Sequence, residues 1–268
     1  MLNKIAIIGV GLIGGSFGMA VRRLGLAAEV VGIGRNERNL RLAKELGAVD
    51  QITTDFREGV KGAAVVLVAT PVSIVAPVVT AISPYLDPGA IVTDVGSTKV
   101  AVVNALEPVA QANWFFFVGG HPMTGSERTG VESADPYLFE NAYYILTKTP
   151  ATDPWALAQV HSLAGAIGGR VVELSPEDHD FYVAAVSHLP HCVAAALVNT
   201  VGGLPEREAV LPFAAGGFRD TTRVASGDPV IWRDILISNS RPILEMIGRY
   251  QTALADLAKL IKSEDGLG

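Results

Sequence analysis

The fold is decided by residues 4–16, which read Lys4-Ile5-Ala6-Ile7-Ile8-Gly9-Val10-Gly11-Leu12-Ile13-Gly14-Gly15-Ser16. The nearly unbroken apolar run predicts a buried parallel strand, and the Gly-x-Gly-x-x-Gly spacing after it predicts a tight turn into a helix. In such a turn Gly9 makes the bend, Gly11 lets the backbone approach a phosphate, and Gly14 lets the helix pack against the strand. Because the helix start also offers N–H groups to an anion, we predict a dinucleotide site. The alternative is a glycine turn that only packs a helix on a sheet.

Strands and helices alternate after this turn. Further strands are predicted at 29–33, 51–53, 65–69, 91–94, 115–119, 142–146 as an edge strand, and 170–174, with helices at 16–24, 37–46, from Pro71 to about Pro84, 99–109 and 154–167. This alternation predicts a parallel, doubly wound α/β sheet of the Rossmann type, with ligands at the carboxyl ends of the strands. From Ser175-Pro176-Glu177-Asp178, a strong helix start, the pattern becomes all helical. We therefore predict a dinucleotide-binding domain at 1–174 and a helical substrate-binding and dimerisation domain at 175–268.

The composition limits the classes of partner. A net charge of −6 over 268 residues argues against nucleic acid or an anionic membrane surface as the main partner. The single cysteine, Cys192, excludes an intramolecular disulfide framework and fits a reducing compartment. We find no signal-peptide pattern at the start, and we expect no apolar stretch long enough and free enough of turn residues to span a bilayer. These features predict a cytoplasmic protein.

The tip of the second strand bears on the choice of cofactor. Where a dinucleotide site usually carries an acid for the adenosine ribose, this chain has Gly34-Arg35-Asn36. Arg35 can pair with a 2′-phosphate, so the pattern favours NADP over NAD. The alternative is that Arg35 stacks on adenine or is solvated while NAD binds. The residues expected to contact the cofactor are Gly9, Gly11, Leu12, Ile13, Gly14, Gly34, Arg35, Asn36, Thr70 and Pro71.

Two residues at strand ends are candidates for proton chemistry. His121 lies in a Gly-Gly-His-Pro loop just after a predicted strand, where a histidine can accept a proton from a substrate hydroxyl. Ser97 follows another strand and can orient His121 or bridge it to the substrate. The alternatives are a histidine that caps a loop and a serine that caps the helix beginning near Lys99.

The second half of the chain supplies groups suited to an anion. A long apolar helix is expected over Phe181–Val201, with a kink at Pro190, and His188 and His191 share one of its faces. Three interpretations of these histidines are a metal pair, structural burial, and binding of an anionic substrate. The metal interpretation would need Asp178, His179 or Asp180, and no recognisable four-ligand spacing supports it. Forked donors for a carboxylate come from Arg219 and Arg223, one of which could pair with Asp220.

The last helix predicts a homodimer. Its apolar residues recur at steps of four and three along the chain, at Ile243, Ile247, Tyr250, Leu254, Leu257 and Ile261. Such a seam needs a partner helix, which a second copy of the chain can provide.

Seven stretches of the chain together resemble the prephenate dehydrogenase family, which includes arogenate and cyclohexadienyl dehydrogenases. They are Gly9–Gly14, Asp94–Lys99, Gly120–Glu127, Pro176–Asp180, Ser187–His191, Phe218–Arg223 and Asp228–Ile235. The resemblance implies oxidative decarboxylation of prephenate to 4-hydroxyphenylpyruvate in tyrosine biosynthesis, with reduction of NAD or NADP. Arogenate, or both substrates, remain alternatives.

The resemblance also implies roles for single residues. His121 would take the proton of the ring 4-hydroxyl, and Ser97 would hold His121 and that hydroxyl. Arg223 would bind a substrate carboxylate and His191 the pyruvyl side chain. Glu127 would act as a polar gate, Trp232 as a nearby wall, and His188 would be structural. A β-hydroxyacid dehydrogenase fits less well, because the corresponding apolar helix has histidines and no lysine, and a non-catalytic nicotinamide-sensing module would not need His121, His191 and Arg223.

Overall fold

The computed structural model describes residues 1–125 and 128–263 and divides the chain into two compact units, Met1–His179 and Asp180–Gly268. The chain passes from the first unit to the second inside helix α7 (Pro176–Val183). The predicted domains, 1–174 and 175–268, stay a prediction, since packing alone does not show which segments fold independently.

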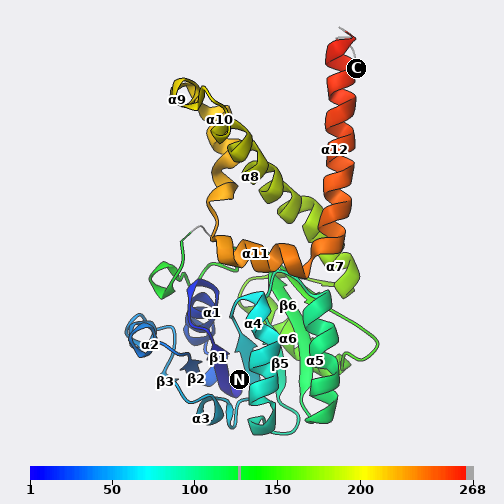
Figure 1. The fold of residues 1–268 in the computed structure, drawn as a ribbon. Coiled ribbons are helices and arrows are strands. Elements are labelled where there is room, and N and C mark those ends of the chain that lie inside the picture. The colour runs from blue at the N-terminus through cyan, green and yellow to red at the C-terminus, as the bar shows by residue number, and fades with distance from the viewer. Residues whose placement is uncertain (126–127, 264–268) are drawn as a thin grey trace. The chain divides into compact units, whose positions relative to one another are not determined.

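The first unit is built on an eight-stranded sheet (Figure 1). Its strands are β1 (Leu2–Ile8), β2 (Ala27–Ile33), β3 (Gln51–Thr53), β4 (Val65–Val68), β5 (Ile91–Asp94), β6 (Phe116–Pro122), β7 (Tyr143–Thr147) and β8 (Arg170–Leu174). They lie in the order β3-β2-β1-β4-β5-β6-β7-β8, and all neighbours from β3 to β6 are parallel. This topology confirms the predicted doubly wound sheet.

The far end of the sheet differs from the prediction. β7 pairs antiparallel with β6 and parallel with β8, so β8 and not the strand near 142–146 forms the edge. The antiparallel pairing also lengthens β6, because Gly120, His121 and Pro122 pair with residues of β7. The spacing of apolar residues along β6 could not predict this extension. The extension depends on pairing with β7, which lies more than 20 residues further along the chain.

Helices cover both faces of the sheet. One face packs against α1 (Leu12–Arg23), α2 (Glu37–Glu45) and α6 (Pro154–Ala166), and the other against α3 (Phe56–Val60), α4 (Val72–Ile82) and α5 (Val100–Ala112). Strand β1 shows why the sheet is buried on both sides: Ile5 and Ile7 enter one apolar cluster, and Ala6 and Ile8 enter the other. The fold therefore leaves the carboxyl ends of the parallel strands as the edge at which ligand groups can gather.

The second unit is helical in its described residues. After the π turn η3 (Ala184–His188) it contains α8 (Leu189–Gly202), α9 (Arg207–Val210), α10 (Gly216–Thr222), the short turn η5 (Arg223–Ser226), α11 (Pro229–Ser238) and α12 (Ser240–Lys262). Its small apolar core joins Ala184 of η3 to Ile243 and Met246 of α12, with Cys192 among the partly buried residues around them. The π turn ends two residues before Pro190, whose missing N–H deprives the carbonyl four residues earlier of a partner. The structure therefore has a wider helical turn next to Pro190, and the kink predicted at this proline stays a prediction.

Helix α12 is covered only over its first part. Ile243 is buried in the core of the second unit, whereas Leu254, Leu257 and Ile261 are 47%, 53% and 70% exposed. The predicted seam therefore divides into an inner end packed within this chain and an outer apolar end exposed in the single chain.

The helical segment Pro176–Gly202 is long and apolar enough to cross a bilayer by length and composition alone. The expectation that no stretch would meet this criterion was therefore wrong. The same test is passed by core helices of proteins that do not enter membranes, and this segment contributes to the apolar core of the second unit.

Candidate active site

The glycine turn lies where the strand order reverses, between β1 and β4. Gly9 has φ +92°, and a Cβ added there would lie 2.5 Å from the carbonyl oxygen of Ala69. A Cβ on Gly14 would lie 2.1 Å from the carbonyl oxygen of Gly9. In contrast, a Cβ on Gly11 would meet no atom within 4 Å. Gly9 and Gly14 are thus required by the packing of the turn, and Gly11 borders open space.

The groups around this turn fit a dinucleotide. Gly11 is the N-cap of α1, and the first turn of α1, which begins with Leu12 and Ile13, carries no acidic residue. Thr70 follows β4, and its buried Oγ1 has no hydrogen-bond partner among the described residues. Pro71 then caps the start of α4. A helix N-terminus without acids, an open glycine and an unpaired buried hydroxyl are what a bound pyrophosphate would use.

At the tip of β2 the three predicted residues have different surroundings. Asn36 is the N-cap of α2, and its Oδ1 accepts a hydrogen bond from the N–H of Asn39 at 3.2 Å. Gly34 packs near Leu40. Arg35 is exposed and forms no ion pair with the described residues, so it is the one of the three whose charge can meet a ligand.

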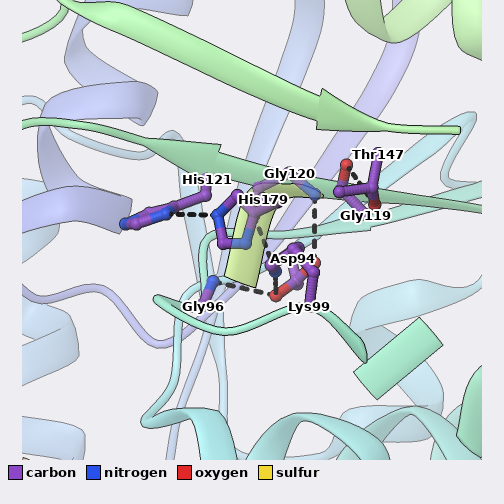
Figure 2. A network of polar contacts seen from close by, with 8 residues as sticks. All are labelled: Asp94, Gly96, Lys99, Gly119, Gly120, His121, Thr147 and His179. Atoms are coloured by element: carbon purple, nitrogen blue, oxygen red, sulfur yellow. Dashed lines mark hydrogen bonds and ion pairs between the residues drawn. The ribbon is translucent and has the colours of Figure 1, made fainter. Parts of the chain in front are cut away.

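A buried ion pair ties the ends of β5 and β6 together (Figure 2). Asp94 and Lys99 are both fully buried and form a short ion pair. The Asp94 carboxylate also accepts hydrogen bonds from the N–H groups of Gly96 at 2.8 Å and Gly120 at 3.1 Å, while Lys99 Nζ donates to the carbonyl of Gly120 at 2.8 Å. A side chain at Gly120 would collide with the Asp94 backbone, which explains the glycine before His121. Gly96 precedes Ser97 and Gly120 precedes His121, so the Asp94 carboxylate fixes the backbone next to each of these two residues.

Tyr144 of β7 borders the same ion pair. Burial raises the pKa of Tyr144 well above its usual range, and the negative charge of Asp94 acts in the same direction. Both effects favour the neutral phenol, and Asp94 and Lys99 are the charged pair of this region.

His121 lies in the last part of β6 and not in the loop after it, because β6 continues to Pro122. Its Nδ1 lies 2.8 Å from Nε2 of His179, and the two rings meet edge to face with centroids 5.1 Å apart. His121 is 9% exposed and His179 is fully buried. The histidine expected to exchange a proton therefore has a second imidazole as its partner.

Ser97 lies in the bend between β5 and α5 and is half-buried. The N-cap of α5 is Lys99, without a side-chain capping bond, so the alternative in which Ser97 caps this helix was wrong. The helix starts at Val100, one residue later than expected.

In the second unit, His191 is fixed on two sides. Its ring is stacked on Trp232, with centroids 3.5 Å apart and planes inclined by 6°, and its Nδ1 lies 2.9 Å from the carbonyl oxygen of Val224. Because a carbonyl can only accept, Nδ1 carries the hydrogen. Desolvation lowers the pKa of His191, and the hydrogen bond to Val224 opposes this in part. The neutral ring therefore has its lone pair on Nε2.

His188 is buried in a different set of contacts. It is 1% exposed, its ring meets Trp232 edge to face, and its Nδ1 lies 3.1 Å from Nδ2 of Asn239, which also donates to the carbonyl of Asp180 at 2.8 Å. These contacts fit the structural role expected for His188. No group of three or more described His, Cys, Asp or Glu residues is arranged to hold a metal ion.

The predicted arginines line an open groove of about 460 Å³ in the second unit. The lining residues are Ala214, Phe218, Arg219, Asp220, Thr222, Arg223 and Ser226. Asp220 forms no ion pair within the described residues, so the pairing expected between Asp220 and one of the two arginines does not occur there. Glu127, the predicted gate, lies outside the described residues.

Three residues of these networks were not singled out from the sequence for the roles they have. Asp94 and Lys99 occurred only within a quoted stretch, and His179 was considered only as a metal ligand. The sequence did contain a signal for Asp94 and Lys99, because they are opposite charges five residues apart on either side of Gly96-Ser97. For His179 the nearest signal was its place four residues after the helix-capping Ser175.

Comparison with known proteins identifies both parts of the chain. Residues 17–173 match the family described as "Prephenate dehydrogenase, nucleotide-binding domain", and residues 175–267 match "Prephenate dehydrogenase, dimerization domain". Prephenate dehydrogenase of Bacillus subtilis is 38% identical over 99% of this chain and 72% of its own length.

Solved structures support the same family assignment. Prephenate dehydrogenase from A. aeolicus, in complex with hydroxyphenyl propionate and NAD+, superposes with a TM-score of 0.92 at 36% identity, over 100% of this chain and 94% of the other. Synechocystis arogenate dehydrogenase gives a TM-score of 0.84 at 35% identity, over 98% and 93% of the two chains. With two matching domains and near-complete coverage, the chain belongs to the prephenate dehydrogenase family.

Proposed function

We propose that this chain catalyses the oxidative decarboxylation of prephenate to 4-hydroxyphenylpyruvate and carbon dioxide, with a nicotinamide cofactor, in tyrosine biosynthesis. Restoration of aromaticity in the ring supplies much of the driving force. The observation that carries the proposal is the position of His121 at the carboxyl end of β6. This is the same edge of the parallel sheet that carries the glycine turn and Thr70.

The first unit would provide the cofactor contacts and the base. Gly11, the start of α1 and the hydroxyl of Thr70 would hold the pyrophosphate. When bound, the nicotinamide ring supplies the acceptor for the hydride from the hydroxyl-bearing ring carbon. His121 would accept the proton of that hydroxyl, which is the work of a general base. Ser97, in the loop held by Asp94, would keep the hydroxyl and His121 aligned.

The second unit would bind the anionic parts of the substrate. Arg223 offers a planar fork suited to a carboxylate, and it lies in the open groove. His191 would contact the pyruvyl side chain, with Trp232 as the wall on which its ring rests. Because a pyruvyl group carries only acceptors, this contact favours prephenate when His191 is protonated.

For the cofactor we propose that NADP is used at least as well as NAD. The support is the exposed Arg35 and the absence of an acid at position 34. We further propose a cytoplasmic homodimer, supported by the dimerisation domain of the family and by the exposed outer end of α12.

The experiment is a steady-state assay of prephenate and of arogenate, each with NAD and with NADP, following the absorbance of the reduced cofactor. His121→Ala should lower kcat by ~10²-fold or more with little change in cofactor binding. Arg223→Ala should mainly raise KM for the substrate. Near-normal turnover of His121→Ala would reject the base, and an unchanged KM in Arg223→Ala would reject the carboxylate contact.

A further inference from the structure

One partner of His121 is another buried histidine (Figure 2). Nδ1 of His121 and Nε2 of His179 are 2.8 Å apart, a normal hydrogen-bond length. A neutral imidazole carries a hydrogen on only one of its two nitrogens. One of the two facing nitrogens must therefore donate and the other accept, so the protonation pattern of one ring fixes that of the other.

His179 lies in the first turn of helix α7, and local hydrogen bonds at this helix start fix its position. Ser175 Oγ accepts the N–H of Asp178 at 3.0 Å, and the carbonyl of Ser175 accepts the N–H of His179 at 3.0 Å. Pro176 suits the first helical turn because that turn needs no donor there. His179 thus comes from a capped helix start whose backbone is set by local bonds, and its ring is fully buried.

We propose that His179 is a positioning residue for the base, holding His121 with its hydrogen on Nδ1 so that Nε2 is the nitrogen that takes the substrate proton. The proposal rests on the base role of His121 proposed above. The opposite arrangement, with His179 Nε2–H donating to His121 Nδ1, would place the hydrogen of His121 on Nε2 and leave that atom unable to accept a proton.

The same contact would act most strongly during the reaction. When His121 takes a proton it becomes an imidazolium, and its bond from Nδ1 to His179 becomes charge-assisted and therefore stronger. An interaction that strengthens as the proton is transferred raises kcat and leaves substrate binding nearly unchanged. This logic resembles that of a carboxylate that orients a catalytic histidine, with a neutral imidazole as the acceptor.

Two substitutions at His179 separate positioning from packing. His179→Phe keeps an aromatic ring but removes the acceptor, and we expect kcat to fall ~30-fold with KM for substrate and cofactor within about twofold. His179→Gln returns an acceptor oxygen near the position of Nε2 and should recover most of the loss. His161→Phe, on the exposed face of α6, is the matched control and should leave kcat unchanged. Unchanged kcat in His179→Phe, or an equal loss in both His179 variants, would overturn the proposal.

A second measurement needs no turnover, and it reads the wild-type protein directly, with a variant used only to assign signals. The chain has five histidines, so ¹⁵N-histidine labelling with long-range ¹H–¹⁵N correlation can identify the tautomer of each ring, with His121→Gln used to assign its signals. We expect hydrogen on Nδ1 for His121 and on Nδ1 for His179. Hydrogen on Nε2 of His121 would overturn the positioning role even if the chain turns over prephenate. The expected tautomers together with an inactive wild-type chain would instead reject the proposed function.

Discussion

The imidazole of His191 lies parallel to the indole of Trp232, with ring centroids 3.5 Å apart. The stack fixes the plane of the ring, and the bond from Nδ1 to the carbonyl of Val224 fixes its rotation in that plane. Nε2 is then the nitrogen through which His191 can recognise a ligand. Its protonation decides whether it offers a donor or an acceptor.

The choice between prephenate and arogenate should therefore depend on pH. By the proposed contact, protonated His191 would donate to the keto acid of prephenate, whereas neutral His191 would accept from the ammonium group of arogenate. Because desolvation lowers the pKa of His191 below its ordinary 6.5, the donor form is lost at an unusually low pH. The ratio of kcat/KM for prephenate over arogenate should fall as the pH rises from about 5 to 7.5. His191→Gln should remove this dependence, and a ratio that is flat in the wild-type protein would contradict it.

The same lowered pKa has a consequence for stability. Between its native value and 6.5 the unfolded chain binds more protons at His191 than the native state does, so stability increases with pH in this range. The contribution is complete above 6.5 and is lost as the pH falls through the native value. In urea unfolding across this range, the stability of wild type relative to His191→Gln should increase as the pH rises.

Breaking the buried Asp94–Lys99 pair should be costly. Asp94→Asn leaves the buried Lys99 ammonium without its counter-charge, and Lys99→Met leaves the buried Asp94 carboxylate without its counter-charge, so each should lower the free energy of unfolding by about 3 kcal/mol or more. The double variant should lose less than the sum, which a double-mutant cycle from urea denaturation measures. Asp256→Asn, in an exposed pair with Lys259, is the control and should have almost no effect. Additive losses at 94 and 99 would show that the pair is not coupled.

The glycine turn allows binding and folding to be separated. A methyl group at Gly11 meets no protein atom, so Gly11→Ala should leave Tm unchanged while raising the Kd of the reduced cofactor by ~10-fold or more, since it fills space that a pyrophosphate would use. Gly9→Ala should lower Tm, because of its φ of +92° and the contact with Ala69. Gly165→Ala in α6, where there is also open space, is the control. An unchanged Kd in Gly11→Ala would place the cofactor elsewhere.

Arg35 should set the preference between the two cofactors. Removal of its charge in Arg35→Ala should raise KM for NADP by ~10-fold and change KM for NAD little, because only NADP carries a 2′-phosphate. Arg41→Ala is a suitable control, since Arg41 is engaged by Glu37 on α2. Equal effects on the two cofactors would mean that Arg35 contacts a part they share.

The outer end of α12 should be needed for the dimer. Leu254 and Leu257 lie on the same helical face, so Leu254→Glu/Leu257→Glu should convert the dimer to monomers in size-exclusion chromatography with light scattering. Thr252→Glu, on the opposite side of the helix by its 100° spacing, should stay dimeric. A wild-type monomer at micromolar concentration would remove the homodimer proposal altogether.

The sequence pattern predicted the parts of this fold that depend on neighbouring residues. The first strand, the bend at Gly9 and the cap at Ser175 follow from apolar runs, glycine spacing and capping residues within a few positions. The contacts around His121 join residues far apart in the chain. His179 is 58 positions from His121, and Lys99 is hydrogen-bonded to the carbonyl of Gly120, 21 positions away from it. These contacts depend on how the strands pair and on where α7 begins. The local spacing of apolar residues does not encode either feature. The same is true of β6, whose end is set by β7.

Burial of Asp94 and Lys99 also constrains how such a protein can evolve. A substitution at only one of the two positions leaves a buried charge without its oppositely charged partner. Related sequences should therefore replace both residues together or keep both. Descendants that replaced the pair with two uncharged side chains would need new anchors for the amides of Gly96 and Gly120. The two positions should therefore covary more tightly than their five-residue separation would suggest.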